Sequence, residues 1–399
     1  MIRLVRCAVM SVSMVVACGV ADQSGTALIE RIEGAGVEVI RVLQPPVEDI
    51  RLTEPLFRIG SEDMDGAEHL AFQLISDVVV MPRGRVVVVD NGGARVSVFD
   101  DAGQWLFDVG RRGQGPGEYT SPLYASTLAD TLFVWDALQR RISRFSWEGQ
   151  FYDTQVLSDW SAGLRFAAVH DGYLREVEWG QLIDPAPARG ALIRVDRSGA
   201  SVDTLVSAYP VPERGWVIRD PATGTGQMIN PPAFEIYPPW TVRDRELVRL
   251  DPEAAAVEFR DTQTGALKRF LRLPYAAEEP STEDRESFLR GLQEEFGIPD
   301  AAMASVKTST LFAERRPPVS GLILDDQGRI WVATHAPDRR SQDYVGSDWD
   351  VVDVENATVV RAVFPDGFRL MSIANGRAYG ITTLDYGVHV VDVFDLHDV

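Results

Sequence analysis

The chain has 399 residues, of which 45% are hydrophobic and 25% charged, and its formal net charge at pH 7 is −20. This composition is that of a globular protein with enough apolar residues for a sizeable core, and not that of a disordered chain. The acidic charge disfavours binding to nucleic-acid phosphates or to anionic lipid headgroups, because both carry the same sign of charge.

The first residues have the pattern of an export signal. Arg3 and Arg6 form a basic start, and the apolar run that follows is too short to span a bilayer as a helix. The run leads into VVAC, which ends at Cys18 and resembles the lipobox of bacterial lipoproteins. That resemblance implies that residues 1–17 are a signal peptide and that Cys18 is lipidated.

The residues around the predicted cleavage point bear on location. Residues 18–26 would form a short tether that holds the folded domain close to a membrane. By resemblance to known sorting signals, Gly19 favours the outer membrane. Cleavage after Ala21, which would release a soluble periplasmic protein, is the alternative. The only cysteines are Cys7 and Cys18, so the folded part has no disulfide framework and must be stabilised by its core.

Residues 77–118 predict a four-stranded antiparallel unit. Runs rich in Val and Phe alternate with turns built from Gly, Asn and Asp, which supply the dihedral angles of tight connections. Three residues of the unit recur in the next unit with the same internal spacing: Asp90, Phe99 and Gly103 correspond to Asp136, Phe145 and Gly149. A four-stranded unit that repeats every 40 to 50 residues or so is typical of β-propellers.

The same pattern continues along the chain. It predicts six blades, at about residues 77–118, 123–157, 164–207, 240–273, 317–364 and 368–394. A helix signature at about 281–298 indicates a short insertion after the fourth blade. We expect residues 26–43 to supply an outer strand to the last blade and so to close the ring. The predicted fold class is an all-β, six-bladed β-propeller with four-stranded antiparallel blades over residues 27–399.

Three sequences resemble bacterial six-bladed β-propeller lipoproteins, which are relatives of NHL-repeat propellers. These sequences are FDDAGQWLFDVGRRGQGPGEY in the first blade, DDQGRIWV in the fifth and DYGVHVVDVFDL near the end of the chain. The N-terminal GVEVIRV looks like the segment that opens those proteins, so the resemblance covers almost all of the chain after the signal. It implies a fold and an exported location, and it implies no activity.

The glycine-rich loop GRRGQGPGE, at residues 110–118, has two interpretations. As a ligand-binding site, Arg111 and Arg112 would clamp an anion, with Glu118 as a polar partner. Alternatively, the glycines supply the dihedral angles of a tight crossover, and Glu118 satisfies backbone donors or an arginine. We favour the second interpretation. The loop is not a dinucleotide fingerprint, because no helix follows it.

Two further sets of residues are candidates for chemistry. His335 ends the strand-like run IWVATH and would bind a ligand if it faced the central channel, although a histidine with a backbone partner is the favoured alternative. Asp90, Asp136 and Asp385 occupy similar repeat positions, where carboxylates could bind calcium. A turn role is favoured for these aspartates, because an active site needs different residues from different blades. No metal-binding residue is predicted.

The sequence contains no GxSxG elbow, no P-loop and no Cys/His pair. The leading functional prediction is therefore a lipid-anchored propeller of the cell envelope that needs no cofactor and binds an envelope protein, a peptide or a glycan. It would contact the membrane only through its anchor and would bind no nucleic acid. The alternative is a metal-dependent hydrolase or lyase of the lactonase type, with calcium in the central channel. The sequence leaves open whether the protein is an enzyme and which oligomer it forms.

Overall fold

The structure is a computed structural model of the whole chain. It describes residues 28–34, 36–61, 70–157, 165–179, 189–210, 216–219, 226–229, 236, 238–296, 312–335, 345–384, 387–397 and 399. The predicted signal peptide, the tether, the lipidated Cys18 and the candidate Asp385 lie outside these residues.

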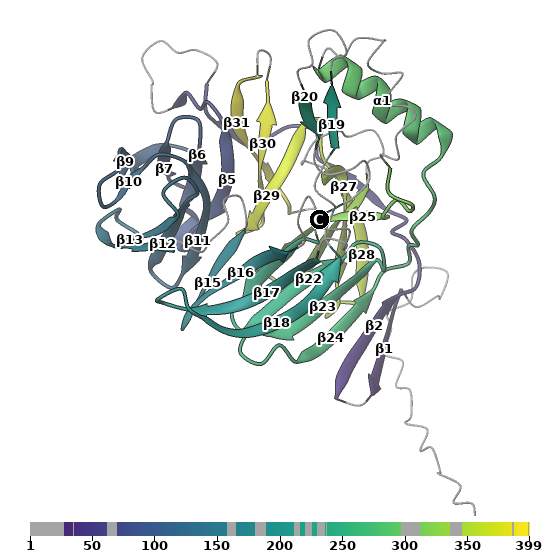
Figure 1. Cartoon of the computed structure of the whole chain (residues 1–399). Helices are drawn as coiled ribbons and strands as arrows, with labels where there is room; N and C mark the ends of the chain where they lie inside the picture. Colours follow the sequence, from purple (N-terminus) through teal and green to yellow (C-terminus); the bar gives the residue numbers. More distant parts are fainter. Residues whose placement is uncertain are drawn as a thin grey trace, which may run out of the picture.

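Six antiparallel sheets of the described chain form the blades of a ring (Figure 1). The first blade contains β5 (Ile75–Val80), β6 (Val86–Asp90), β7 (Arg95–Phe99) and β8 (Trp105–Asp108), with a 3₁₀ turn at Pro82–Gly84. The second contains β11 (Pro122–Leu128), β12 (Thr131–Asp136), β13 (Arg141–Ser146) and β14 (Phe151–Val156). The third contains β15 (Phe166–Val169), β16 (Gly172–Trp179), β17 (Arg189–Asp196) and β18 (Ser201–Pro210).

The second half of the ring repeats this arrangement. The fourth blade contains β21 (Trp240–Arg243), β22 (Glu246–Asp251), β23 (Ala256–Asp261) and β24 (Leu267–Arg272). The fifth contains β25 (Val319–Leu324), β26 (Ile330–His335), β27 (Val345–Asp353) and β28 (Thr358–Val363). The sixth contains β29 (Phe368–Ala374), β30 (Arg377–Thr383) and β31 (His389–Asp395). Two small ribbons accompany the blades, β9 (Arg111–Arg112) with β10 (Glu118–Tyr119), and β19 (Trp216–Arg219) with β20 (Gly226–Ile229). The predicted order of six blades is confirmed, but the first blade ends at Asp108 and not at residue 118, because the residues in between belong to the loop and ribbon of β9 and β10.

An apolar layer fills the space between each blade and the next. Strand β6, with the sequence VVVVD, is apolar at successive positions and does not alternate between apolar and polar residues. Val86 and Val88 belong to the layer shared with the sixth blade, whereas Val87 and Val89 belong to the layer shared with the second. Successive side chains of a strand point to opposite faces, so a strand that is covered on both faces is apolar at every position.

The N-terminal strap, residues 29–59, runs along the outer edges of three blades in turn. The hairpin of β1 (Ile29–Gly34) and β2 (Val37–Val42) adds to the fourth blade, because β2 pairs in parallel with β24. Strand β3 (Asp49–Arg51) then pairs in parallel with β28 of the fifth blade.

The last strand of the strap closes the ring. Strand β4 (Phe57–Ile59) pairs antiparallel with β31 and is the fourth strand of the sixth blade. An N-terminal strand therefore closes the last blade as predicted, but the prediction that residues 26–43 supply it is wrong. The closing strand is only three residues long, and its pairing is fixed by partners near the C-terminus, so no local pattern marks it.

The predicted insertion is the helix α1 (Thr282–Phe296). Its start is capped reciprocally, because Ser281 Oγ accepts from the backbone N–H of Asp284 at 3.0 Å and Asp284 Oδ2 accepts from that of Ser281 at 2.8 Å. The helix is fixed by the buried ring of Phe288, which packs edge-on against Phe312 at 5.7 Å between centroids. Within the described residues, no helix has the length and apolarity that a membrane span requires.

Candidate functional site

The glycine-rich loop at residues 110–118 folds onto its own charged residues. Arg111 Nε donates to Glu118 Oε1 at 2.7 Å, and the backbone N–H of Gly115 donates to Glu118 Oε2 at 2.8 Å. These two donors, the Gly115 amide first, hold the pKa of Glu118 below its ordinary value. Arg112 Nη2 donates to the carbonyl of Gly92 at 3.1 Å. Both oxygens of the Glu118 carboxylate thus have partners within the loop.

A buried arginine from the second blade binds the backbone of this loop. Arg141 donates to the carbonyls of Gln114, Gly115 and Glu118 at 3.1, 2.6 and 2.5 Å. This is the geometry of a tight crossover, in which a side chain donates to backbone carbonyls that do not pair with a neighbouring strand. A ligand role for Arg111, Arg112 and Glu118 stays a prediction.

Asp90 and Asp136 have the turn role that we favoured. Asp90 Oδ1 accepts from the backbone N–H groups of Gln73, Leu74 and Gly93 at 3.0 to 3.2 Å. Asp136 accepts in the same way from the backbone N–H groups of Thr120, Ser121 and Gln139 at 2.6 to 3.2 Å. Each carboxylate therefore joins the turn after the second strand of a blade to the segment that enters the blade.

The part of the chain that the structure describes does not place the remaining candidates, His335 and a calcium site, in a formed site. His335 lies at the end of β26, and the position of its side chain is outside the description. No group of three or more His, Cys, Asp or Glu side chains in the described part of the chain is placed to hold a metal ion. The calcium alternative stays a prediction.

The first strands of the blades bring together polar residues that the sequence did not single out. Strands β5, β11 and β15 contact one another in order, and β29 contacts β5, so these strands surround the axis of the ring. They hold Asp77 on β5, Tyr124 on β11 and Arg369 on β29, with Arg165 directly before β15. We call these four residues the inner-strand cluster. They come from four different blades.

Asp77 is fixed by backbone donors of two blades. Its Oδ2 accepts from the N–H of Ala125 on β11 at 2.9 Å, and its Oδ1 accepts from the N–H of Val78 at 3.0 Å. Strand β11 is the edge strand of its sheet, so its inward N–H groups have no further strand to pair with. On the other side, Arg369 Nη2 donates to the carbonyl of Ile75 at 3.5 Å. The cluster thus sits where neighbouring blades are joined.

The charges of the cluster act on one another. Burial raises the pKa of Asp77 above its ordinary value, and the guanidinium groups of Arg165 and Arg369 act in the opposite direction. Burial also raises the pKa of Tyr124, where the charge of Arg165 opposes the effect and that of Asp77 adds to it. Titratable groups that perturb one another in this way are common at functional sites. The cluster brings two guanidinium groups, a phenol and a carboxyl group from four blades close together.

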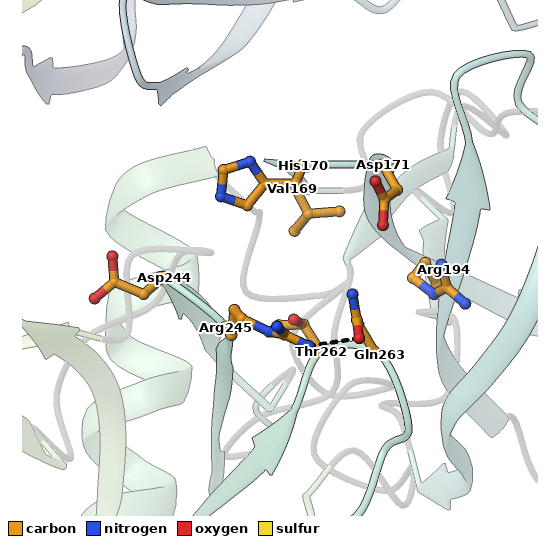
Figure 2. Close-up of a pocket in the computed structure, with 8 residues that line it drawn as sticks. All are labelled: Val169, His170, Asp171, Arg194, Asp244, Arg245, Thr262 and Gln263. Carbon is orange, nitrogen blue, oxygen red and sulfur yellow. Dashed lines mark hydrogen bonds between the residues drawn. The ribbon is translucent and has the colours of Figure 1, made fainter.

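A second concave feature lies between the third and fourth blades (Figure 2). It is a hollow of about 200 Å³ at the hairpin turns of the two blades. Its lining includes His170 and Asp171 from the third blade, and Asp244, Arg245 and Gln263 from the fourth. Its volume is below the roughly 300 to 1,000 Å³ of pockets for drug-sized ligands, so only a small molecule would fit it.

The comparisons with known proteins address the fold. Residues 66–208 match the family model DUF5128, described as a 6-bladed beta-propeller. A comparison with curated proteins gives no match.

Solved structures provide distant likenesses. A Bacteroides fragilis protein assigned as exported has 10% identity and a TM-score of 0.49, with 86% of this chain and 99% of that chain covered. A DUF4221 member from Bacteroides vulgatus has 8% identity and a TM-score of 0.47, with 86% and 98% covered. Regucalcin, a calcium-binding protein from Agrobacterium tumefaciens, has 10% identity and a TM-score of 0.40, with 88% and 97% covered. Likenesses this remote carry no conclusion about activity.

The family match and the sheets of the chain agree. The matched residues 66–208 cover the first three blades except for the last two residues of β18, and the topology of the described residues contains all six blades. The chain is therefore a six-bladed β-propeller, and residues 66–208 are similar in sequence to the propellers that this model describes.

Proposed function

We propose that this protein is an exported, lipid-anchored binding module of the cell envelope, and that its ligand site is the inner-strand cluster. The convergence of Asp77, Tyr124, Arg165 and Arg369 from four blades is the observation that carries the proposal. Structural residues of a repeat recur from blade to blade, as Asp90 and Asp136 do. A binding site needs side chains of different chemistry from different blades, and this cluster combines an acid, a phenol and two arginines.

A peptide is the ligand class that the cluster matches best. Arg165 is exposed and offers a guanidinium to a carboxylate, whereas Tyr124 and Asp77 offer a donor and an acceptor to amide groups. A ligand with both donors and acceptors suits a site that mixes positive and negative groups. A strongly anionic ligand would be repelled by a chain whose net charge is −20.

Thermal unfolding of the whole protein with a panel of di- and tripeptides tests the binding proposal. A ligand that binds only the folded state stabilises it by roughly 2.7 kcal/mol at a concentration one hundred times its Kd. We expect at least one peptide to raise the unfolding midpoint, and Arg165→Met and Arg369→Met to remove that increase. Arg41→Met, which removes an exposed arginine of the strap, serves as the charge-matched control. A panel without any midpoint shift, or a shift that both cluster variants retain, would contradict the proposal.

The anchor is tested separately in the producing cell. The VVAC sequence before Gly19 supports lipidation at Cys18. We expect the wild-type protein in the membrane fraction and the Cys18→Ser variant in the soluble fraction or uncleaved. A Cys18→Ser variant that is cleaved and still membrane-bound would argue against a lipid anchor, without bearing on the ligand site.

A further inference from the structure

The hollow between the third and fourth blades contains an arginine that its own blade leaves without a partner. Arg194 lies on β17 and is directly opposite Asp203 of β18 in the sheet register. Among the described residues, its guanidinium makes no hydrogen bond and no ion pair, and its Nε is shielded from solvent. A shielded donor without a partner costs free energy, so its orientation requires an explanation.

In the second blade, an arginine and an aspartate at the equivalent positions bind each other within the sheet. Arg144 stands two residues before the turn residue Ser146, as Arg194 stands two residues before Asp196. Arg144 binds both carboxylate oxygens of Asp153, which is opposite it in the register, with Nε to Oδ1 at 2.6 Å. The third blade has an arginine and an aspartate at the equivalent positions, Arg194 and Asp203, but Arg194 lines the hollow instead of binding Asp203 (Figure 2).

The other groups of the hollow define which ligand would accept these hydrogen bonds. Arg245 donates one hydrogen bond to Gln263 Oε1 and has further N–H donors, and His170 lies across the hollow from it (Figure 2). Guanidinium groups are donors only, and their fork matches the two oxygens of an oxyanion. Asp171 and Asp244 stand at opposite sides of the hollow and would repel a doubly charged anion more than a singly charged one.

We propose that the blade 3–4 hollow binds the carboxylate group of a small organic acid or amino acid, held by Arg194 and Arg245. The volume of about 200 Å³ suits a molecule of that size. An amino acid suits the hollow further, because its ammonium group complements Asp171 or Asp244. The site is separate from the inner-strand cluster and does not depend on the function proposed for it.

Isothermal titration calorimetry of the whole protein tests this site with propionate, alanine and inorganic phosphate at constant ionic strength. We expect saturable one-to-one binding of propionate or alanine and weaker binding of phosphate. Arg194→Met is expected to weaken the binding at least tenfold, whereas Arg41→Met leaves it unchanged. The Arg41→Met variant removes the same charge far from the hollow, on the hairpin of the strap.

A second variant covers the case in which Arg194→Met does not fold. Arg245 is exposed on a turn, so Arg245→Met is expected to keep the thermal midpoint and also to weaken binding. No saturable binding would show that water alone satisfies Arg194. Equal weakening by Arg41→Met would indicate an adventitious ion only, and tighter binding of phosphate than of both carboxylates would overturn the assigned ligand class.

Discussion

Arg58 on β4 donates to both carboxylate oxygens of Asp392 on β31, from Nε at 2.6 Å and from Nη2 at 3.0 Å. Thr382 adds a third donor, with its Oγ1 at 2.7 Å from Asp392 Oδ2. The carboxylate is buried, since Asp392 is 4% exposed. The two charged residues are 334 positions apart, so their pairing fastens the N-terminal strap to the last blade and closes the ring.

Replacing Arg58 with Met is expected to destabilise the fold by about 2 to 3 kcal/mol. Removal of one partner of a fully buried ion pair typically costs about 3 to 5 kcal/mol, because the other charge stays buried. The cost here falls below that range, since 40% of the Arg58 side chain is exposed and Thr382 still binds Asp392. The measurement is the free energy of unfolding from a urea titration.

Arg51→Met is the matched control for this prediction. Arg51 lies on the same strap and faces Asp49 at 3.4 Å, but both side chains are exposed. Exposed pairs contribute about 0 to 1 kcal/mol, so this variant should unfold close to the wild type. Similar losses in the two variants would mean that Arg58 contributes only as a surface charge.

The turn glycine Gly103 is expected to lose stability with any added side chain. Its φ of +79° is unfavourable for other residues, and an added Cβ would lie 2.8 Å from the ring of Phe57 on the closing strand. Gly367 has a similar φ of +82° but open space around the Cβ position. We expect Gly367→Ala to cost about 1 kcal/mol for the backbone alone.

Gly103→Ala should cost about 1 to 2 kcal/mol more than Gly367→Ala, because Phe57 must move out of its packed position. The difference between the two unfolding free energies therefore isolates the contact between the first blade and β4. If the two alanine variants lose the same stability, Phe57 does not constrain the turn.

The fold was predictable because each blade repeats one physical pattern. A buried apolar second strand, VVVVD in β6 and TLFVWD in β12, and a glycine turn after the third strand recur from the first blade to the second, and both can be recognised in short stretches of sequence. The closing strand β4 could not be read in this way. Its three residues close the ring only because they pair with β31 near the C-terminus, and no short stretch of sequence contains both strands.

The candidate site was less predictable than the fold. The loop with Arg111 and Glu118 stands out because its composition is unusual, yet its groups bind one another. Asp77 and Tyr124 lie in ordinary strand sequences, and only the closure of the ring brings them near Arg369. A site assembled from single residues of separate blades leaves no motif.

Glu118→Gln is expected to reduce stability at neutral pH and to have little effect in acid. The pKa of Glu118 is lowered in the folded protein, from an ordinary value of 4.5, by the Gly115 amide and Arg111. Its ionised form therefore stabilises the fold above about pH 4.5, and this contribution is lost as the pH falls through the lowered pKa. The measurement is the thermal midpoint of both proteins between pH 7 and pH 3. A difference that grows towards acid would contradict the predicted sign.

Tyr275 connects the segment after the fourth blade to the fifth. Its hydroxyl donates to Asp350 Oδ2 and accepts from Arg361 Nη2 at 3.1 Å, while Arg361 Nε donates to Asp350 Oδ1 at 2.9 Å. Burial raises the pKa of Asp350, and its bonds to Arg361 and Tyr275 act against this effect. The hydroxyl of Tyr275 therefore makes the ionised, buried carboxylate less costly.

Tyr275→Phe is expected to lower the unfolding free energy by about 1 to 3 kcal/mol at pH 7, since the hydrogen bond is made to a charged group. The exposed Tyr152 provides the control, and Tyr152→Phe should change stability by less than about 0.5 kcal/mol. Without Tyr275, the pKa of Asp350 in the folded protein rises further, so the variant loses this stability only where Asp350 is ionised in the folded wild type, above its raised pKa, and not in acid. Urea titrations at pH 7 and pH 3 should show a smaller difference at pH 3. A loss that is equal at both pH values would mean that Tyr275 acts through packing and not through the charge of Asp350.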